Sequence, residues 1–274
     1  MRLVRPLAVV ALVLVVVGTV VRKAVDAVAD RPDLPQTWLA AGARLVDLDA
    51  EANVPTWFST LLLALLAAAC AVTGLLLRAR GERSWPLLLP ALVAAAMSLD
   101  ELAQLHEDLQ LLSERLDLGS PNAFGWVVPG AAVAVGVGVV LLFAARAMAP
   151  ALRWRLVAAG VVYFAGALGV EVLAGPLYRP GQGDQVPVQS TLYVLSNALE
   201  EGLEMAGALV ALAAVLALLR VRSTPQGVVV DLARPPLAAR GPRRSGARAQ
   251  GDELRGARGD HGRAPLEEAP QRQR

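Results

Sequence analysis

The sequence is short of charge, of histidine and of cysteine. Charged residues make up 18% of its 274 residues and hydrophobic residues 55%, whereas about a quarter of the residues of a soluble domain are charged. A soluble chain of this composition would lack the polar surface needed to cover its core, so the composition indicates an integral membrane protein. Cys70 is the only cysteine, which excludes a disulfide scaffold, and two histidines exclude any site that needs three.

Apolar runs that can cross a bilayer occur six times. A crossing helix needs about 20 residues; the first run has a shorter apolar core that extends at both ends. We therefore predict an all-α fold, a polytopic membrane helix bundle with six transmembrane helices within residues 1–222. The first run also resembles a cleavable signal peptide, and its cleavage would leave five spans. The predicted spans are about 3–24, 56–78, 85–106, 125–147, 153–175 and 189–220.

Basic residues gather at alternate ends of these spans, and acidic residues dominate the opposite loops. By the positive-inside rule, this alternation predicts that both termini are cytoplasmic. Lys23 is the only lysine among 26 basic residues, a bias typical of a high-GC bacterial genome, so we expect a multi-pass protein of the bacterial plasma membrane. The basic set is Arg2, Arg5, Arg78, Arg80, Arg83, Arg146, Arg153, Arg155, Arg220 and Arg222.

Residues 223–274 are rich in Arg, Gly, Pro and Ala. Such a segment cannot bury enough apolar surface to offset the entropy of ordering it, so we predict a disordered basic cytoplasmic tail. The tail can contact anionic lipid head groups. We expect no nucleic-acid partner.

Acidic residues inside the apolar spans carry the functional signal. Counted at 1.5 Å per residue from the arginine-rich end of each helix, Glu101, Glu171 and Glu204 all lie at a depth of about 24 Å. Asn197, Glu201 and Glu204 share one helix face. Because charges within a membrane are costly, these residues should face a wet pocket inside the bundle. The candidate metal-binding residues are Asp100, Glu101, His106, Glu171, Glu200, Glu201 and Glu204, with Ser98, Gln104 and Asn197 lining the pocket.

Several carboxylates without a basic partner need protons or a cation to offset their repulsion. Carboxylates and amides suit Ca²⁺, Mg²⁺ or Mn²⁺, and His106 would also allow Fe²⁺ or Zn²⁺, so the expected cofactor is a divalent metal ion of undetermined identity. The Glu-x-x-His pattern of di-iron bundles is absent, because Ala103 stands three residues before His106. A zinc hydrolase site of the ceramidase type needs three histidines and cannot be assembled.

Three functions fit these residues. The first is a membrane protein whose outward-facing carboxylate cluster binds a divalent cation or protons. The second is a metal-dependent enzyme acting on a lipid-linked substrate at the outer leaflet, with His106 or Glu201 as general base. The third is a non-catalytic scaffold whose acids pair with a partner helix. The sequence identifies no catalytic residue, and the expected partners are the lipid bilayer and a second copy or another membrane protein.

Overall fold

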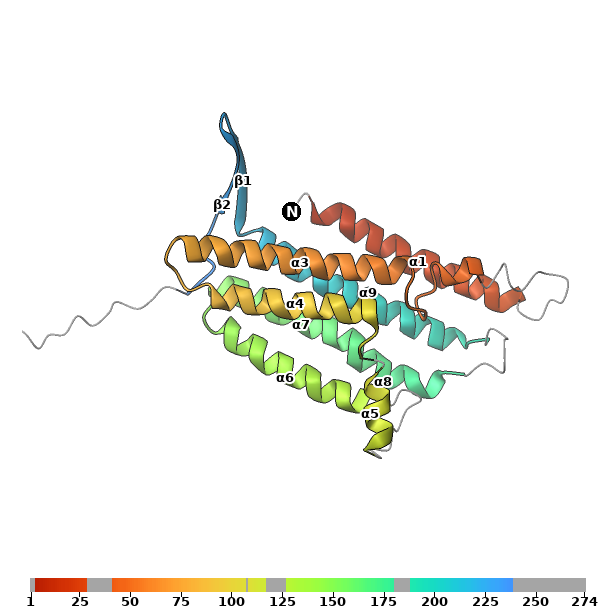
Figure 1. The fold of residues 1–274 in the computed structure, drawn as a ribbon. Helices are drawn as coiled ribbons and strands as arrows, with labels where there is room; N and C mark the ends of the chain where they lie inside the picture. The colour runs from red at the N-terminus through yellow and green to blue at the C-terminus, as the bar shows by residue number, and fades with distance from the viewer. Residues whose placement is uncertain (1–2, 29–40, 107, 117–126, 180–187, 239–274) are drawn as a thin grey trace, which may run out of the picture. The chain divides into compact units, whose positions relative to one another are not determined.

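The computed structural model describes residues 3–28, 41–106, 108–116, 127–179 and 188–238, and within them the chain is mostly helical (Figure 1). The elements before residue 146 are α1 (Val4–Val28), α3 (Val54–Ala79), α4 (Trp85–Ala103), α5 (Leu109–Arg115) and α6 (Val127–Ala145). They are followed by α7 (Pro150–Phe164), a π-helical turn η1 (Ala165–Val170), α8 (Glu171–Ala174), a 3₁₀ turn η2 (Gly175–Leu177), α9 (Thr191–Leu216), and strands β1 (Leu219–Thr224) and β2 (Gly227–Leu232).

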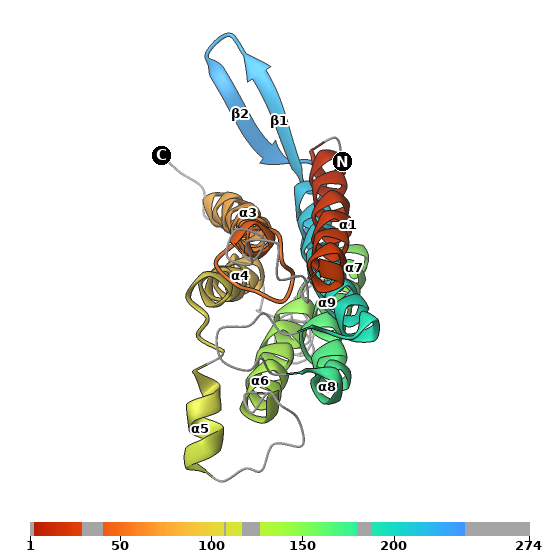
Figure 2. The same ribbon diagram turned by 90° about the vertical axis from the view of Figure 1, so that its right-hand side faces the viewer.

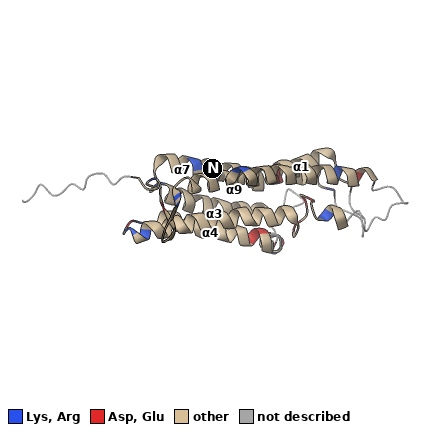
Figure 3. Ribbon diagram, turned by 90° about the horizontal axis from the view of Figure 1, so that it is seen from above, with Lys and Arg blue, Asp and Glu red and all other residues tan. Residues whose placement is uncertain are grey.

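Within the described residues, five helical segments are long and apolar enough to cross a membrane: α1, α3, α4, α6 and the segment Pro150–Leu177 that runs from α7 to η2. In Figure 3, basic residues mark one end of α3 and α4, and acidic residues mark the other end of α4. These helices support a multi-pass membrane protein in contact with lipid. The helix α9 is 26 residues long but carries Glu200, Glu201 and Glu204, so the sixth crossing and the side on which the termini lie stay predictions.

The helix α9 is the central element, since it contacts α1, α3 and α7, while α3 and α4 form a closely packed pair. It begins at Ser190, whose hydroxyl accepts a hydrogen bond from the Tyr193 N–H at 3.1 Å. Small residues allow its close contacts: a Cβ placed on Gly207 would lie 2.8 Å from the Ala159 carbonyl oxygen of α7. Close approach through glycine is how helices associate inside lipid.

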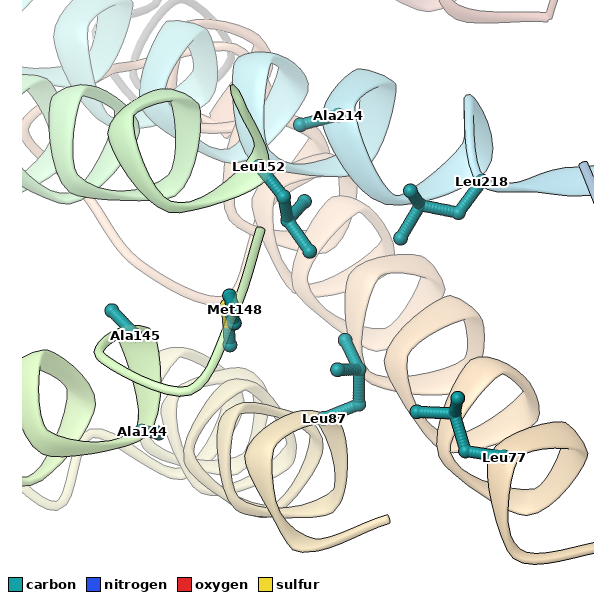
Figure 4. Close-up of a cluster of buried hydrophobic side chains, with 8 residues drawn as sticks. All are labelled: Leu77, Leu87, Ala144, Ala145, Met148, Leu152, Ala214 and Leu218. Carbon is teal, nitrogen blue, oxygen red and sulfur yellow. The ribbon is translucent and has the colours of Figure 1, made fainter. Parts of the chain in front are cut away.

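A cluster of buried apolar side chains joins the ends of α3, α4, α6, α7 and α9 (Figure 4). Leu77, Leu87 and Ala144 are completely buried in it. Arginines such as Arg78, Arg146 and Arg153 lie next to the clustered residues in the chain, so we call this the arginine-rich end of the bundle. The residues drawn are Leu77, Leu87, Ala144, Ala145, Met148, Leu152, Ala214 and Leu218.

Two predicted spans differ from the helices observed. The third was expected to reach residue 106, but α4 ends at Ala103 because Gln104 adopts a left-handed conformation (φ 58°) and its N–H donates to the Asp100 carbonyl oxygen at 2.7 Å. The fifth was expected to be a regular helix over 153–175, but the π-helical turn Ala165–Val170 interrupts it. A period of 3.6 residues predicts neither feature.

The tail prediction is wrong at its start. Residues 219–232 form an antiparallel hairpin in which Arg220 pairs with Asp231 and Val221 with Val230. Pro225 and Gly227 occupy positions that favour a tight turn, and the β-branched valines favour strands. The described structure continues to Ala238, whose N–H donates to the Ala147 carbonyl oxygen at 3.0 Å. The remainder of the predicted tail, 239–274, lies outside the described residues.

The helix α1 is offset along the bundle. It begins part-way along α3 and extends past the other end of α3, away from the arginine-rich end (Figures 1 and 3). Consequently the last turns of α1, which carry Arg22, Lys23 and Asp26, lie beside the segment that precedes α3. We call this end of the molecule the acidic end.

Candidate functional site

Four carboxyl groups toward the acidic end lie near enough to interact electrostatically. Glu101 belongs to the last turn of α4, Glu201 and Glu204 lie on one face of α9, and Glu51 precedes α3. Glu201 interacts electrostatically with Glu101 and Glu51, and Glu204 with Glu201 and Glu101. We call Glu51, Glu101, Glu201 and Glu204 the acidic cluster. The helix spacing i, i+3 on α9 explains why Glu201 and Glu204 point to the same side.

His106 lies beside this cluster and joins two segments. Its Nδ1 is 3.2 Å from Asp100 Oδ2, and its Nε2 is 3.4 Å from Glu51 Oε1. The left-handed residue Gln104 makes this possible, because it ends α4 and turns the chain back toward the last helical turn. His106 therefore connects the end of α4 to the segment before α3.

The pKa of His106 reflects two opposing effects. Burial lowers it, but the hydrogen bond to Asp100 and the negative charges of Asp100, Glu51 and Glu101 outweigh burial, so the pKa lies above its ordinary value of 6.5. The folded protein thus favours the imidazolium form. In that form both ring nitrogens donate, and His106 can bond to both carboxylates at once.

We predict that His106 makes stability fall as the pH rises. Because its folded-state pKa is raised above 6.5, its contribution is complete below that pH and is lost as the pH rises through the folded-state value. The thermal midpoint of purified protein in detergent, measured from about pH 6 to about pH 8.5, should fall more steeply for the wild type than for His106→Gln. Parallel profiles would contradict the contact.

The polar atoms next to the cluster form two further pairs. Tyr163 of α7 shares a side-chain hydrogen bond with Glu204. Glu171, which follows the π-helical turn, lies within interaction distance of Glu200. Two carboxyl groups can form a hydrogen bond with each other only when one of them is protonated.

A second polar network lies at the acidic end, and it centres on Arg22. The Arg22 side chain is 8% exposed; its Nε lies 3.3 Å from Asp26 Oδ1 and its Nη1 lies 3.1 Å from Asp47 Oδ2. Lys23 also reaches Asp26, at 3.2 Å. This network connects the end of α1 to the segment that precedes α3.

Asp49 continues the network to α9. Its Oδ1 accepts hydrogen bonds from the Tyr193 hydroxyl at 2.6 Å and from the Asn197 amide at 2.8 Å. Burial raises the pKa of Asp49 and Asp47 adds to this, although the Tyr193 and Asn197 bonds and the charge of Arg22 oppose them. A small cavity lies between these groups, lined by Gly18, Thr19, Arg22, Asp49, Gln189 and Asn197 among others.

The sequence profile of a family described as a domain of unknown function, DUF8692, matches residues 7–219. The chain belongs to this family. The match begins at residue 7, within α1, and continues through α9, and both polar networks lie within it. No curated protein and no solved structure matches the chain.

Within the DUF8692 domain, the predicted site residues fall into separate groups. Glu101, Glu201 and Glu204 come together, His106 contacts Asp100, and Glu171 pairs with Glu200. Among the residues that the structure describes, no three His, Cys, Asp or Glu side chains converge closely enough to hold one metal ion. Metal binding at these residues therefore stays a prediction.

The three predicted pocket residues have other contacts in the DUF8692 domain. The Ser98 hydroxyl donates to the Thr60 carbonyl oxygen at 3.0 Å, Asn197 donates to Asp49, and Gln104 ends α4. Glu51 and the residues of the Arg22 network were not among the predicted site residues. The signal that could have indicated them is the alternation of Asp47, Asp49 and Glu51 in one of the acidic loops.

Proposed function

We propose that the DUF8692 domain is an intramembrane cation-binding module, in which the acidic cluster binds protons or a divalent metal ion. The observation that carries this proposal is the composition of the cluster. The charged groups that act most strongly on Glu101, Glu201 and Glu204 are other acidic side chains and His106. Arg22 and Lys23 are engaged by Asp26 and Asp47 instead.

Electrostatics requires such a cluster to take up positive charge. Removing an unpaired carboxylate from water costs several kcal/mol. Carboxylates that share a site cannot all remain ionised without a counter-charge. Protons or a metal ion supply that charge without a basic side chain.

Both forms of bound charge have support. Protons are supported by the proximity of Glu171 to Glu200, since two neighbouring carboxyl groups can hydrogen-bond to each other by sharing one proton. A hard metal ion is supported by the carboxylate oxygens, and by Glu201 Oε2, which is buried and makes no hydrogen bond with any described residue. The experiment below separates the two.

The apolar half of the bundle supports binding rather than passage. Toward the arginine-rich end, the space between helices is filled by apolar clusters that include Leu77, Leu87, Cys70, Leu212 and Val215. Among the described residues, these clusters separate the acidic cluster from the arginine-rich end. We therefore propose a site that exchanges its cation with the acidic end alone.

We predict that Glu204→Gln removes a bound cation. If the cation is a proton, the wild type in detergent has an infrared band of protonated carboxyl groups, and the variant loses part of it. If it is a metal ion, elemental mass spectrometry finds the ion in the wild type, and the variant binds it roughly tenfold or more weakly. Glu82→Gln is the matched control, since Glu82 is exposed at the arginine-rich end.

Two results would contradict this function. One is an infrared spectrum and a metal content that are the same in Glu204→Gln, Glu82→Gln and wild type. The other is a wild type without protonated carboxyl groups at neutral pH whose thermal midpoint does not respond to Ca²⁺, Mg²⁺, Mn²⁺ or Zn²⁺.

A further inference from the structure

The β1–β2 hairpin has one apolar face and one arginine-bearing face. Residues directly opposite each other in an antiparallel pair lie on the same face. The pairs Val221–Val230 and Ser223–Val228 therefore share a face, which also includes Leu219 and Leu232; we call it the apolar face. The opposite face carries Arg220, Arg222, Val229 and Asp231.

The base of the hairpin is fixed to the arginine-rich end of the bundle. Asp231 forms an ion pair with Arg80 at the end of α3. Leu232 packs against the apolar cluster of Figure 4, and the Ala233 N–H donates to the Leu218 carbonyl oxygen at 2.6 Å. At its base, the hairpin therefore contacts the helix ends through both faces: Leu232 of the apolar face packs against them, and Asp231 of the opposite face pairs with Arg80.

The rest of the hairpin projects sideways from the bundle. In Figures 1 and 2 it runs across the direction of the helices and extends beyond their outline. Its apolar side chains are unprotected by the protein: Val221 is 66% exposed and Val228 is 69% exposed. A two-stranded hairpin with such a face is at best marginally stable in water, so another surface must cover it.

The position of the hairpin indicates which surface covers it. β1 starts at Leu219, just after α9 ends at Leu216, and the hairpin leaves the bundle near the ends of α3, α4, α6 and α7 (Figure 1). The ends of helices that span a bilayer lie at the head groups. A segment that leaves the side of the bundle at these helix ends therefore lies in the head-group region. Unpaired strand edges are tolerated there because water remains available, whereas they are excluded from the hydrocarbon core.

The charge of this end indicates the lipid. Arg220 and Arg222 flank Val221, and further arginines lie at the neighbouring helix ends. Arginine side chains are long enough to reach phosphates beside an inserted apolar face, and anionic lipids attract such clusters. The arginines of this end are Arg78, Arg80, Arg83, Arg146, Arg153, Arg155, Arg220 and Arg222.

We propose that the apolar face of the β1–β2 hairpin lies in the head-group region of an anionic phospholipid membrane, with its arginines bound to lipid phosphates. This places the expected lipid contact in a defined, ordered element. It does not depend on the acidic cluster, which lies toward the other end of the bundle.

Neighbouring residues on opposite faces provide the test. Val228→Cys and Val229→Cys are each labelled with an environment-sensitive fluorophore in the full-length protein, since Cys70 is buried and does not compete for the label. The proteins are placed in nanodiscs of phosphatidylcholine with and without phosphatidylglycerol. With phosphatidylglycerol present, spin-labelled lipid should quench the label at 228 several-fold more than the label at 229, and an aqueous quencher should do the reverse.

Further variants keep the test decisive. Position 221 lies on the same face as position 228, so Val221→Cys is used instead if Val228→Cys misfolds. Arg220→Gln with Arg222→Gln should reduce the gain from phosphatidylglycerol. Equal quenching at 228 and 229 would overturn the proposal. Protection at 228 that persists in detergent and increases with protein concentration would also overturn it, because a second copy would then cover the face.

Discussion

Replacing Arg22 with methionine is expected to lower the free energy of unfolding by about 3–5 kcal/mol, the cost typical of removing one partner from a buried ion pair. The Arg22 side chain is only 8% exposed and contacts both Asp26, whose side chain is 4% exposed, and Asp47. Without the guanidinium, these two carboxylates lose the cation that they share. The measurement is the unfolding midpoint in detergent.

Lys23→Met is the matched control for Arg22→Met. Lys23 contacts the same Asp26 at 3.2 Å, but its side chain is 35% exposed and it does not bridge to the segment before α3. Because exposed ion pairs contribute about 0–1 kcal/mol, this variant should unfold close to the wild type. Adding Asp47→Asn to Arg22→Met should recover part of the loss. Equal destabilisation by both single variants would contradict a bridging role for Arg22.

Gly207→Ala is expected to destabilise the α7–α9 contact by about 1–3 kcal/mol, the usual cost of overpacking. The added methyl group would lie 2.8 Å from the Ala159 carbonyl oxygen and 2.8 Å from the Tyr163 Cβ. Both neighbours belong to the backbone or to its first side-chain carbon, so neither can move without shifting α7. A shift of α7 would also carry Tyr163 away from Glu204.

Gly202→Ala isolates this effect on the same helix. The nearest atom to an added methyl group at position 202 is Val15 Cγ2, 4.0 Å away. Both variants gain the helix propensity of alanine, which is worth up to about 1 kcal/mol. Gly202→Ala should therefore equal or exceed the wild type in unfolding midpoint while Gly207→Ala falls below it. A loss of the same size in both would mean that the close contact is not the cause.

The sequence predicted the positions of the helices well, because apolar runs and their length depend on local composition alone. The expected first span, 3–24, corresponds to α1, and the expected second, 56–78, corresponds to α3. The prediction failed where a single residue changes the path of the chain. Gln104 ends α4 early, and the resulting turn gives His106 its place between Asp100 and Glu51.

The candidate site was predicted only in part, for a related reason. Helix periodicity placed Glu201 and Glu204 on one face, and equal depth placed Glu101 near them. No periodicity relates Arg22 to Asp47 or Asp49 to Asn197, since those contacts depend on the offset of α1 and on the path of the segment before α3. The metal-dependent enzyme and the partner-helix scaffold stay predictions, because neither gained support from a specific contact.

The π-helical turn Ala165–Val170 has a consequence for comparing members of the family. A π-turn takes up one extra residue within a single turn, so the residues that follow keep the direction they would have in a regular helix one residue shorter. Here the turn brings Gly166 close to the Glu200 carbonyl oxygen, and Glu171, the residue after the turn, interacts with the Glu200 side chain. A homologous chain that lacks the extra residue should therefore form a regular helix here and keep a carboxyl group facing α9 at the position that aligns with Glu171. An alignment without a one-residue gap in this turn would match the wrong residues from here to the end of η2.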